Sequence, residues 1–73
     1  MNKRDPEAKI ARILAAAITL FARDGRAGAR IDAIAAAAGM NKRMLYHYVG
    51  DKQALFDATV EECVKRVAEG FES

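Results

Sequence analysis

Runs of helical periodicity separated by glycines constrain the fold of this chain more than any other feature. Apolar residues recur every three or four positions, the spacing of one buried helix face, and no segment alternates as a half-buried strand does. The runs predict helices over about residues 6–24, 31–38, 42–49 and 52–70. A chain of 73 residues has room for one small domain. We therefore expect a single all-α domain, a small helical bundle of four helices.

Each predicted helix has its own start and stop signals. Asp5 and Pro6 are a favoured N-cap and a favoured first helical residue for the first helix. Asn41 and Asp51 are the expected N-caps of the third and fourth helices. Glycine readily adopts the left-handed conformation that follows many helices, and the three glycines expected to end helices are Gly25, Gly39 and Gly50. Residues 26–30 are then a short connection.

The apolar positions predict which face each helix buries. The first helix is expected to bury Ile10, Ile13, Leu14, Ala17, Ile18, Leu20 and Phe21; the second Ile31, Ile34, Ala35 and Ala38; the fourth Leu55, Phe56, Thr59, Val60, Cys63, Val64, Val67 and Phe71. Cys63 is interpreted as a small buried hydrophobe. The fourth stripe runs further than the other helices can cover, so we also expect an exposed apolar patch around Val60 and Val64.

The middle of the chain has the spacing of a helix-turn-helix unit. Two short helices flank a glycine, and Ile31, Ala35, Gly39 and Leu45 occupy the first, fifth, ninth and fifteenth positions of the unit. A small residue is needed at Ala35 because the third helix crosses there, and Gly39 permits the positive φ of the turn. An ordinary helical hairpin has similar residues, so spacing alone leaves both interpretations open.

The exposed side of the third helix favours a helix-turn-helix unit over an ordinary helical hairpin. If Leu45 faces inward, Arg43 and His47 point outward, with Met44 and Tyr46 on the flanks. Lys42 lies in the first turn, where the helix dipole already favours anions and a basic side chain destabilises the isolated helix. A polyanion that docks at this end explains such a placement.

Charge is distributed unevenly along the chain. The net charge is +2, but residues 1–50 hold nine Lys and Arg against four Asp and Glu, whereas residues 51–73 hold three against six. A basic front part suggests an anionic partner, although chance produces comparable asymmetry in small domains.

Several motifs together resemble a known family. They are Phe21-Ala22-Arg23-Asp24-Gly25, the run from Ile34 to Asn41, Leu45-Tyr46-His47-Tyr48-Val49, and Asp51-Lys52-Gln53-Ala54-Leu55-Phe56. Over residues 9–60 the chain resembles the TetR (tetracycline-repressor-like) transcriptional regulators. The resemblance implies a homeodomain-like helix-turn-helix domain that binds double-stranded DNA in the major groove.

The resemblance also implies base-reading residues on the third helix. Lys42, Arg43, Met44 and Tyr46 match positions that face major-groove base edges in the family, and Asn41, the N-cap that precedes them, is also a candidate DNA-binding residue. Arg43 replaces a residue that is commonly small in the family, so we expect it to add a contact to DNA.

Phosphate contacts are implied on both sides of that helix. Tyr46, His47 and Tyr48 match positions whose polar groups reach phosphates. Lys52, at the start of the fourth helix, matches a lysine that grips the DNA backbone. Arg30, at the start of the second helix, holds another phosphate-contact position and replaces a usual threonine, which exchanges a neutral cap for a charge.

The chain departs from the family pattern elsewhere as well. Arg26 replaces an aromatic residue, which puts a packing contact in doubt, and Val49 replaces a frequent phenylalanine, which thins the core. The family normally continues into a helical region that binds a small ligand and dimerises. We expect this chain to be an excised DNA-binding domain, a monomer or weak dimer by itself. The full-length protein is expected to be a homodimeric repressor on a palindromic operator, released by a small ligand.

Other function classes have less support in the sequence. His47 is the only histidine and Cys63 the only cysteine, whereas a metal site needs three or four ligands, so we expect no metal, no cofactor and no enzyme. A lone cysteine fits a reducing compartment. Without a targeting or membrane-spanning segment, the predicted location is the cytoplasm. The alternative to DNA binding is a helical protein-interaction module that uses the fourth-helix stripe.

Overall fold

The computed structural model describes residues 6–72, with side chains described for residues 7–70. It contains four helices, α1 (Pro6–Gly28), α2 (Ile31–Ala37), α3 (Lys42–Val49) and α4 (Lys52–Glu72), and no strand occurs within the described range. The all-α prediction is confirmed, and α3 has the predicted bounds. The second helix ends one residue earlier than predicted, and the fourth continues two residues further. The predicted N-cap Asp5 lies outside the described residues.

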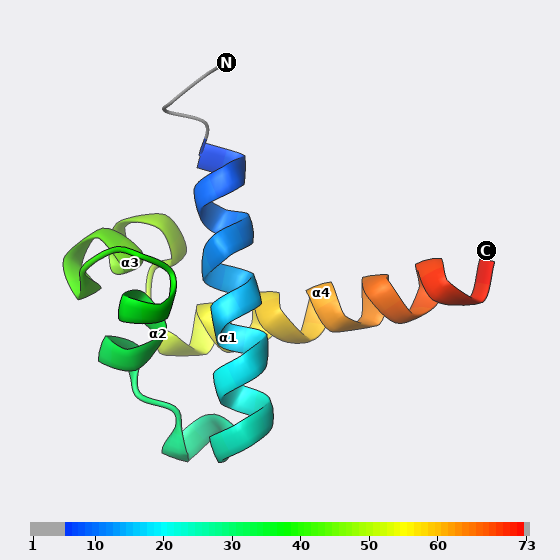
Figure 1. The fold of residues 1–73 in the computed structure, drawn as a ribbon, viewed down its shortest axis with the longest axis horizontal. Coiled ribbons are helices and arrows are strands. Elements are labelled where there is room, and N and C mark those ends of the chain that lie inside the picture. Colours follow the sequence, from blue (N-terminus) through cyan, green and yellow to red (C-terminus); the bar gives the residue numbers. More distant parts are fainter. Residues whose placement is uncertain (1–5, 73) are drawn as a thin grey trace.

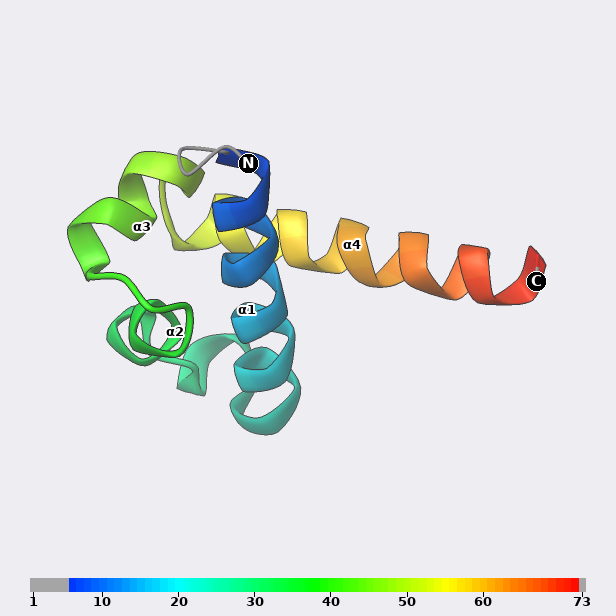
Figure 2. The ribbon, with the colours of Figure 1, turned by 45° about the horizontal axis from the view of Figure 1, so that its top comes forward.

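The helices form a flat molecule, with principal extents of 37 × 36 × 17 Å. In Figure 1, α1 runs through the middle, α2 and α3 lie on one side of it, and α4 crosses it. The C-terminal half of α4 projects away from the other helices, as the second view also shows (Figure 2). α3 therefore lies at the edge of the molecule opposite the projecting end of α4.

The end of α1 differs from the prediction. Gly25 has φ 77° and ψ 171°, so helical geometry breaks at the predicted residue. The chain then makes one more helical turn, because the amide of Ala29 donates a 3.0 Å hydrogen bond to the carbonyl oxygen of Gly25. The predicted break at Gly25 is confirmed, but the prediction that residues 26–30 form a connection is wrong, because residues 26–28 form this further helical turn. Only residues 29 and 30 connect α1 to α2.

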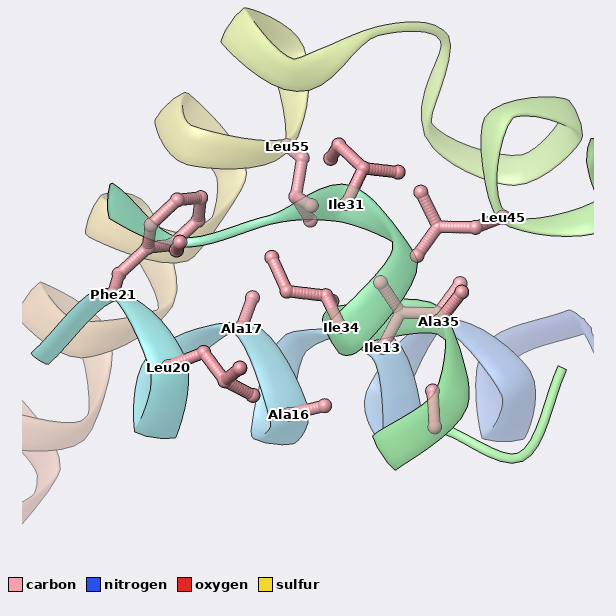
Figure 3. Packing of buried hydrophobic residues seen from close by; sticks show 12 residues of the cluster. Ile13, Ala16, Ala17, Leu20, Phe21, Ile31, Ile34, Ala35, Leu45 and Leu55 are labelled. Carbon is pink, nitrogen blue, oxygen red and sulfur yellow. The ribbon is translucent and has the colours of Figure 1, made fainter. Parts of the chain in front are cut away.

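A single apolar core joins all four helices (Figure 3). α1 presents small side chains such as Ala17 to α2, which lets the two helices approach closely. Leu45 from α3 and Leu55 from α4 point into the same cluster and are fully buried. The buried apolar residues are Ile13, Ala16, Ala17, Leu20, Phe21, Ala29, Ile31, Ile34, Ala35, Ala38, Leu45 and Leu55. The predicted inward face of α2 is confirmed at every position.

The predicted stripe of α4 is buried only in its first half. Leu55 and Thr59 are buried, and the Thr59 hydroxyl donates to the carbonyl oxygen of Leu55 at 2.7 Å. Val60, Val64 and Val67 are exposed, in agreement with the expected apolar patch.

The prediction that Cys63 is buried is wrong, since this residue is exposed. The physical reason is the direction in which α4 leaves the bundle: beyond Thr59 its side nearest to α1 carries Glu62 and Arg66, which line a shallow surface hollow with Ile10 and Leu14 of α1. The side chain of Phe71 lies outside the described residues.

Candidate nucleic-acid interface

The turn between α2 and α3 has the geometry of a glycine C-cap. Gly39 has φ 79°, in the left-handed region. The amide of Gly39 donates to the carbonyl oxygen of Ala36, and the amide of Met40 donates to that of Ala35, both at 3.0 Å. These two bonds form the Schellman pattern, which satisfies carbonyl groups at a helix end. The predicted helix-turn-helix register is therefore confirmed.

Both ends of α3 are held by local interactions. Asn41 has extended backbone geometry, and its side-chain oxygen accepts a 2.7 Å hydrogen bond from the amide of Met44. Gly50, with φ 95°, ends the helix and donates its amide to the carbonyl oxygen of Tyr46 at 2.8 Å. In the same way, the Asp51 carboxylate accepts from the amide of Ala54 at 2.7 Å and caps α4. Asn41 and Asp51 therefore fix where α3 and α4 begin, and Gly50 fixes where α3 ends.

Leu45 sets the rotation of α3. Because this side chain is fully buried, Arg43 and His47 must face solvent, and the structure has both exposed. Met44 is also exposed, whereas Tyr46 and Tyr48 are half-buried against the edge of the core. The sequence prediction for the outward face of this helix is confirmed.

An open hollow on one side of α3, called the outer hollow here, is lined by Asn41, Arg43, Met44, His47 and Tyr48. The rings of His47 and Tyr48 meet edge to face, with centroids 5.4 Å apart and an interplanar angle of 77°. Arg43 is the only permanently charged side chain in this lining. The outer hollow therefore combines one guanidinium, one thioether and two rings with hydrogen-bonding groups.

A second open hollow, called the basic hollow here, lies where the starts of α2, α3 and α4 meet the end of α1. Its charged and polar lining consists of Arg30, Asp32, Lys42, Tyr46 and Lys52. Arg30 is the N-cap of α2, and Lys42 and Lys52 are the first residues of their helices. Helix N-termini carry partial positive charge, so these cations lie where the backbone already favours an anion. The Lys42 ammonium nitrogen lies 3.5 Å from a carboxylate oxygen of Asp32.

The structure brings the nine candidate residues together in these two hollows. The outer hollow holds Asn41, Arg43, Met44, His47 and Tyr48, and the basic hollow holds Arg30, Lys42, Tyr46 and Lys52. Sequence reasoning missed Asp32, the one acid of the basic hollow. The sequence shows that Asp32 lies in the first turn of α2, where an acid stabilises a helix start. It does not show that Asp32 pairs with Lys42.

The sequence put a packing contact at Arg26 in doubt, because arginine replaces an aromatic residue there. In the structure Arg26 makes a different contact. Its guanidinium lies over the ring of Phe56, 5.4 Å from the centroid, and donates a hydrogen bond to the side-chain oxygen of Gln53. Phe56 in turn meets Phe21 edge to face, with centroids 5.1 Å apart. Arg26 thereby ties the end of α1 to the start of α4 beside the basic hollow.

Among residues 6–72, no three His, Cys, Asp or Glu side chains gather closely enough to hold a metal ion. None of the described helices is long and apolar enough to cross a membrane.

Comparison with known proteins agrees with this geometry. The sequence model of the family described as bacterial regulatory proteins, tetR family, matches residues 13–59, which run from α1 through the capped turn and α3 into α4. The chain is 55% identical over 62 residues to the HTH-type transcriptional repressor SCO4008 of Streptomyces coelicolor, a match that covers 85% of this chain and 32% of that protein. It is 43% identical over 49 residues to the HTH-type transcriptional repressor NicS of Pseudomonas putida, which covers 67% of this chain and 23% of that protein. The chain thus spans less than a third of the length of these relatives. By its helix-turn-helix structure and its family match, the chain belongs to the tetR family of bacterial regulatory proteins and carries that family's N-terminal DNA-binding domain.

Proposed function

We propose that this domain recognises a specific double-stranded DNA sequence by placing α3 in the major groove, and that it acts as part of a transcriptional repressor. The observation that carries the proposal is the division of the cations between the two hollows. Arg43 faces the outer hollow, whereas Arg30, Lys42 and Lys52 meet in the basic hollow. Base edges specify a sequence and phosphates position the protein, so a DNA reader needs both kinds of surface.

In this proposal the outer hollow reads bases. Arg43 has the planar fork that binds O6 and N7 of guanine in two parallel hydrogen bonds, and Met44 offers an apolar contact to a thymine methyl group. His47 and Tyr48, which the resemblance assigns to phosphates, line the same hollow and supply polar groups beside the base-reading side chains. Asn41 acts mainly by positioning, because its oxygen already accepts from the Met44 amide.

The basic hollow grips the DNA backbone. Arg30 and Lys52 are assigned to phosphate, as the family resemblance implies. The resemblance places Lys42 at base edges and allows Tyr46 to contact either base edges or phosphates. Both are assigned to phosphate here because they line the basic hollow rather than the outer one. A cluster of side chains from the starts of three helices can hold one phosphate from several directions.

Two copies are expected to bind a palindromic operator. One reading helix covers only part of a site, and two-fold symmetric regulators read half-sites about 34–36 Å apart. Both relatives described above are named as repressors, which supports repression as the outcome. We place the protein in the cytoplasm with the DNA that it regulates, as a regulator rather than an enzyme.

Selection of binding sites from random duplexes tests the proposal. The domain would be used both alone and as two copies joined by a flexible linker. The joined form is expected to enrich an inverted repeat, whereas the single domain binds weakly, in the range of about 10⁻⁴–10⁻⁶ M that is typical of non-specific binding. If the joined form enriches no sequence while remaining folded, sequence-specific recognition is ruled out.

A further inference from the structure

Asp32 places a negative charge in the hollow that is proposed to bind phosphate. It lines the basic hollow together with Arg30, Lys42 and Lys52, and no other acidic side chain lines that hollow. Its carboxylate lies 3.5 Å from the Lys42 ammonium group. A phosphate that enters the hollow would meet this negative charge beside the cations that attract it.

A stabilising role at the start of α2 accounts for the presence of an acid. The N-cap residue Arg30 makes no side-chain hydrogen bond to the helix, so the first amides of α2 lack the usual cap. Asp32 is the acid in the first turn of this helix, where a negative charge interacts favourably with the dipole. In the free protein Asp32 thus supplies the negative charge that both the start of α2 and Lys42 attract.

We propose, resting on the function proposed above, that Asp32 is a built-in competitor of the DNA phosphate for Lys42. Without DNA, Lys42 is paired with Asp32. When α3 docks, a backbone phosphate takes over the ammonium group, and the protein gives up the internal pair. Asp32 thereby lowers the affinity of the domain for every duplex, because a phosphate contact carries no sequence information.

The exposure of the pair makes this exchange easy. The side chains of Lys42 and Asp32 are 56% and 63% exposed, so neither is locked in place by packing. Exposed ion pairs of this kind are weak, which sets the size of the effect. Breaking the pair in advance should tighten DNA binding by about two- to fivefold, the equivalent of one exposed pair.

Asp32→Asn tests the proposal, since it keeps the shape of the side chain and removes the charge. Glu61→Gln is the matched control: it makes the same change in net charge at an exposed position of α4, nine residues beyond Lys52. Nine residues of helix span about 14 Å, which exceeds the screening length of about 10 Å at 0.1 M salt. Binding of the 73-residue chain to a mixed-sequence duplex would be titrated at several salt concentrations.

We expect Asp32→Asn to bind about two- to fivefold more tightly than the parent, with a salt dependence close to that of the parent, because Lys42 contacts the same phosphate in both complexes. Glu61→Gln should change the affinity less. The gain should disappear in a Lys42→Gln background, because the two residues act as one pair. Circular dichroism of each variant would verify that α2 remains folded.

Three results would overturn the proposal. Asp32→Asn could bind more weakly than the parent, which would make Asp32 a positioning residue for Lys42. It could gain no more than Glu61→Gln, which would reduce the effect to net charge. It could keep its full gain when Lys42 is already replaced, which would show that the carboxylate acts on the whole surface. Failure of the parent chain to bind any duplex would instead refute the proposed function, and the inference with it.

Discussion

Replacement of Gly39 by valine should destabilise the domain through the backbone of a single residue. Gly39 has φ 79°, a conformation that a β-branched residue strongly resists. A Cβ atom built at this position would have only one neighbour within contact range, a terminal nitrogen of Arg12 at 4.0 Å. The Cβ atom itself therefore meets no collision, and the dominant expected cost is backbone strain.

The magnitude follows from the strain of one residue held in the left-handed region. Such strain costs about 1–3 kcal/mol, and valine belongs at the upper end because its branched side chain also restricts χ1. For a domain of this size, 1 kcal/mol lowers Tm by about 4–8 °C. We expect Gly39→Val to lose about 2–3 kcal/mol, Gly39→Ala somewhat less, and Gly39→Asn least, since asparagine tolerates this conformation best.

Thermal unfolding followed by circular dichroism measures these differences. Gly70 offers a matched control within the same chain, because it lies in α4 and a Cβ atom there would have no neighbour within 4 Å. Gly70→Ala should leave Tm unchanged or raise it slightly, since alanine is the better helix former. The order of the three Gly39 variants separates backbone strain from a general effect of side-chain size.

One result would refute the reasoning about the turn. If Gly39→Val unfolds at the same temperature as the parent, Gly39 does not need a left-handed conformation. The hydrogen bonds from the amides of Gly39 and Met40 back into α2 would then be absent in solution, and the register that aims α3 would be wrong.

Four other predictions concern the interface and α4. Arg43→Ala should cost about 1–3 kcal/mol of DNA-binding free energy and relax the preference at one base pair. Lys52→Ala should weaken binding to all duplexes equally and reduce the salt slope by about 0.9. If Arg43→Ala loses the same affinity for specific and scrambled DNA, Arg43 contacts phosphate. Asn41→Ala should lower stability by about 0.5–2 kcal/mol, with thermal unfolding as the measurement and an unchanged Tm as the contrary result. Val64 lies in the exposed apolar patch of α4, so sedimentation should find weak self-association at high concentration that Val64→Lys abolishes; association that persists in this variant would place the contact elsewhere.

Local signals were enough to predict the helix-turn-helix. Asn41 and Asp51 cap helices because their side chains reach an amide three residues ahead, which depends only on the neighbouring backbone. Gly39 ends α2 for an equally local reason. The bounds of α3 and its buried residue Leu45 follow from these short-range effects, and so does the exposure of Arg43.

Features that depend on distant parts of the chain were predicted less well. Whether Cys63 is buried depends on the angle at which α4 crosses α1. The spacing of apolar residues along α4 does not determine that crossing angle. The sequence indicated the loss of a packing contact at Arg26, because its partner Phe56 is far away in sequence. In the structure, the Arg26 guanidinium at the end of α1 lies over the Phe56 ring in α4. The extra turn after Gly25 also escaped prediction, since a glycine break normally ends a helix.

The convergence of cations in the basic hollow links these two kinds of information. Each cation stands at the start of a helix, and each is followed within three residues by a buried core residue: Arg30 by Ile31, Lys42 by Leu45, and Lys52 by Leu55. The sequence contains these three pairs, but it does not state that the three core residues share one cluster. Once they do, the starts of α2, α3 and α4 must lie near one another, and their cations must gather. The same packing brings Asp32 close to Lys42, because Asp32 is the second residue of α2 and Lys42 is the first residue of α3. The proposed phosphate-binding surface is therefore a consequence of the apolar core, and a core substitution that moves α3 should alter DNA affinity without touching a charged residue.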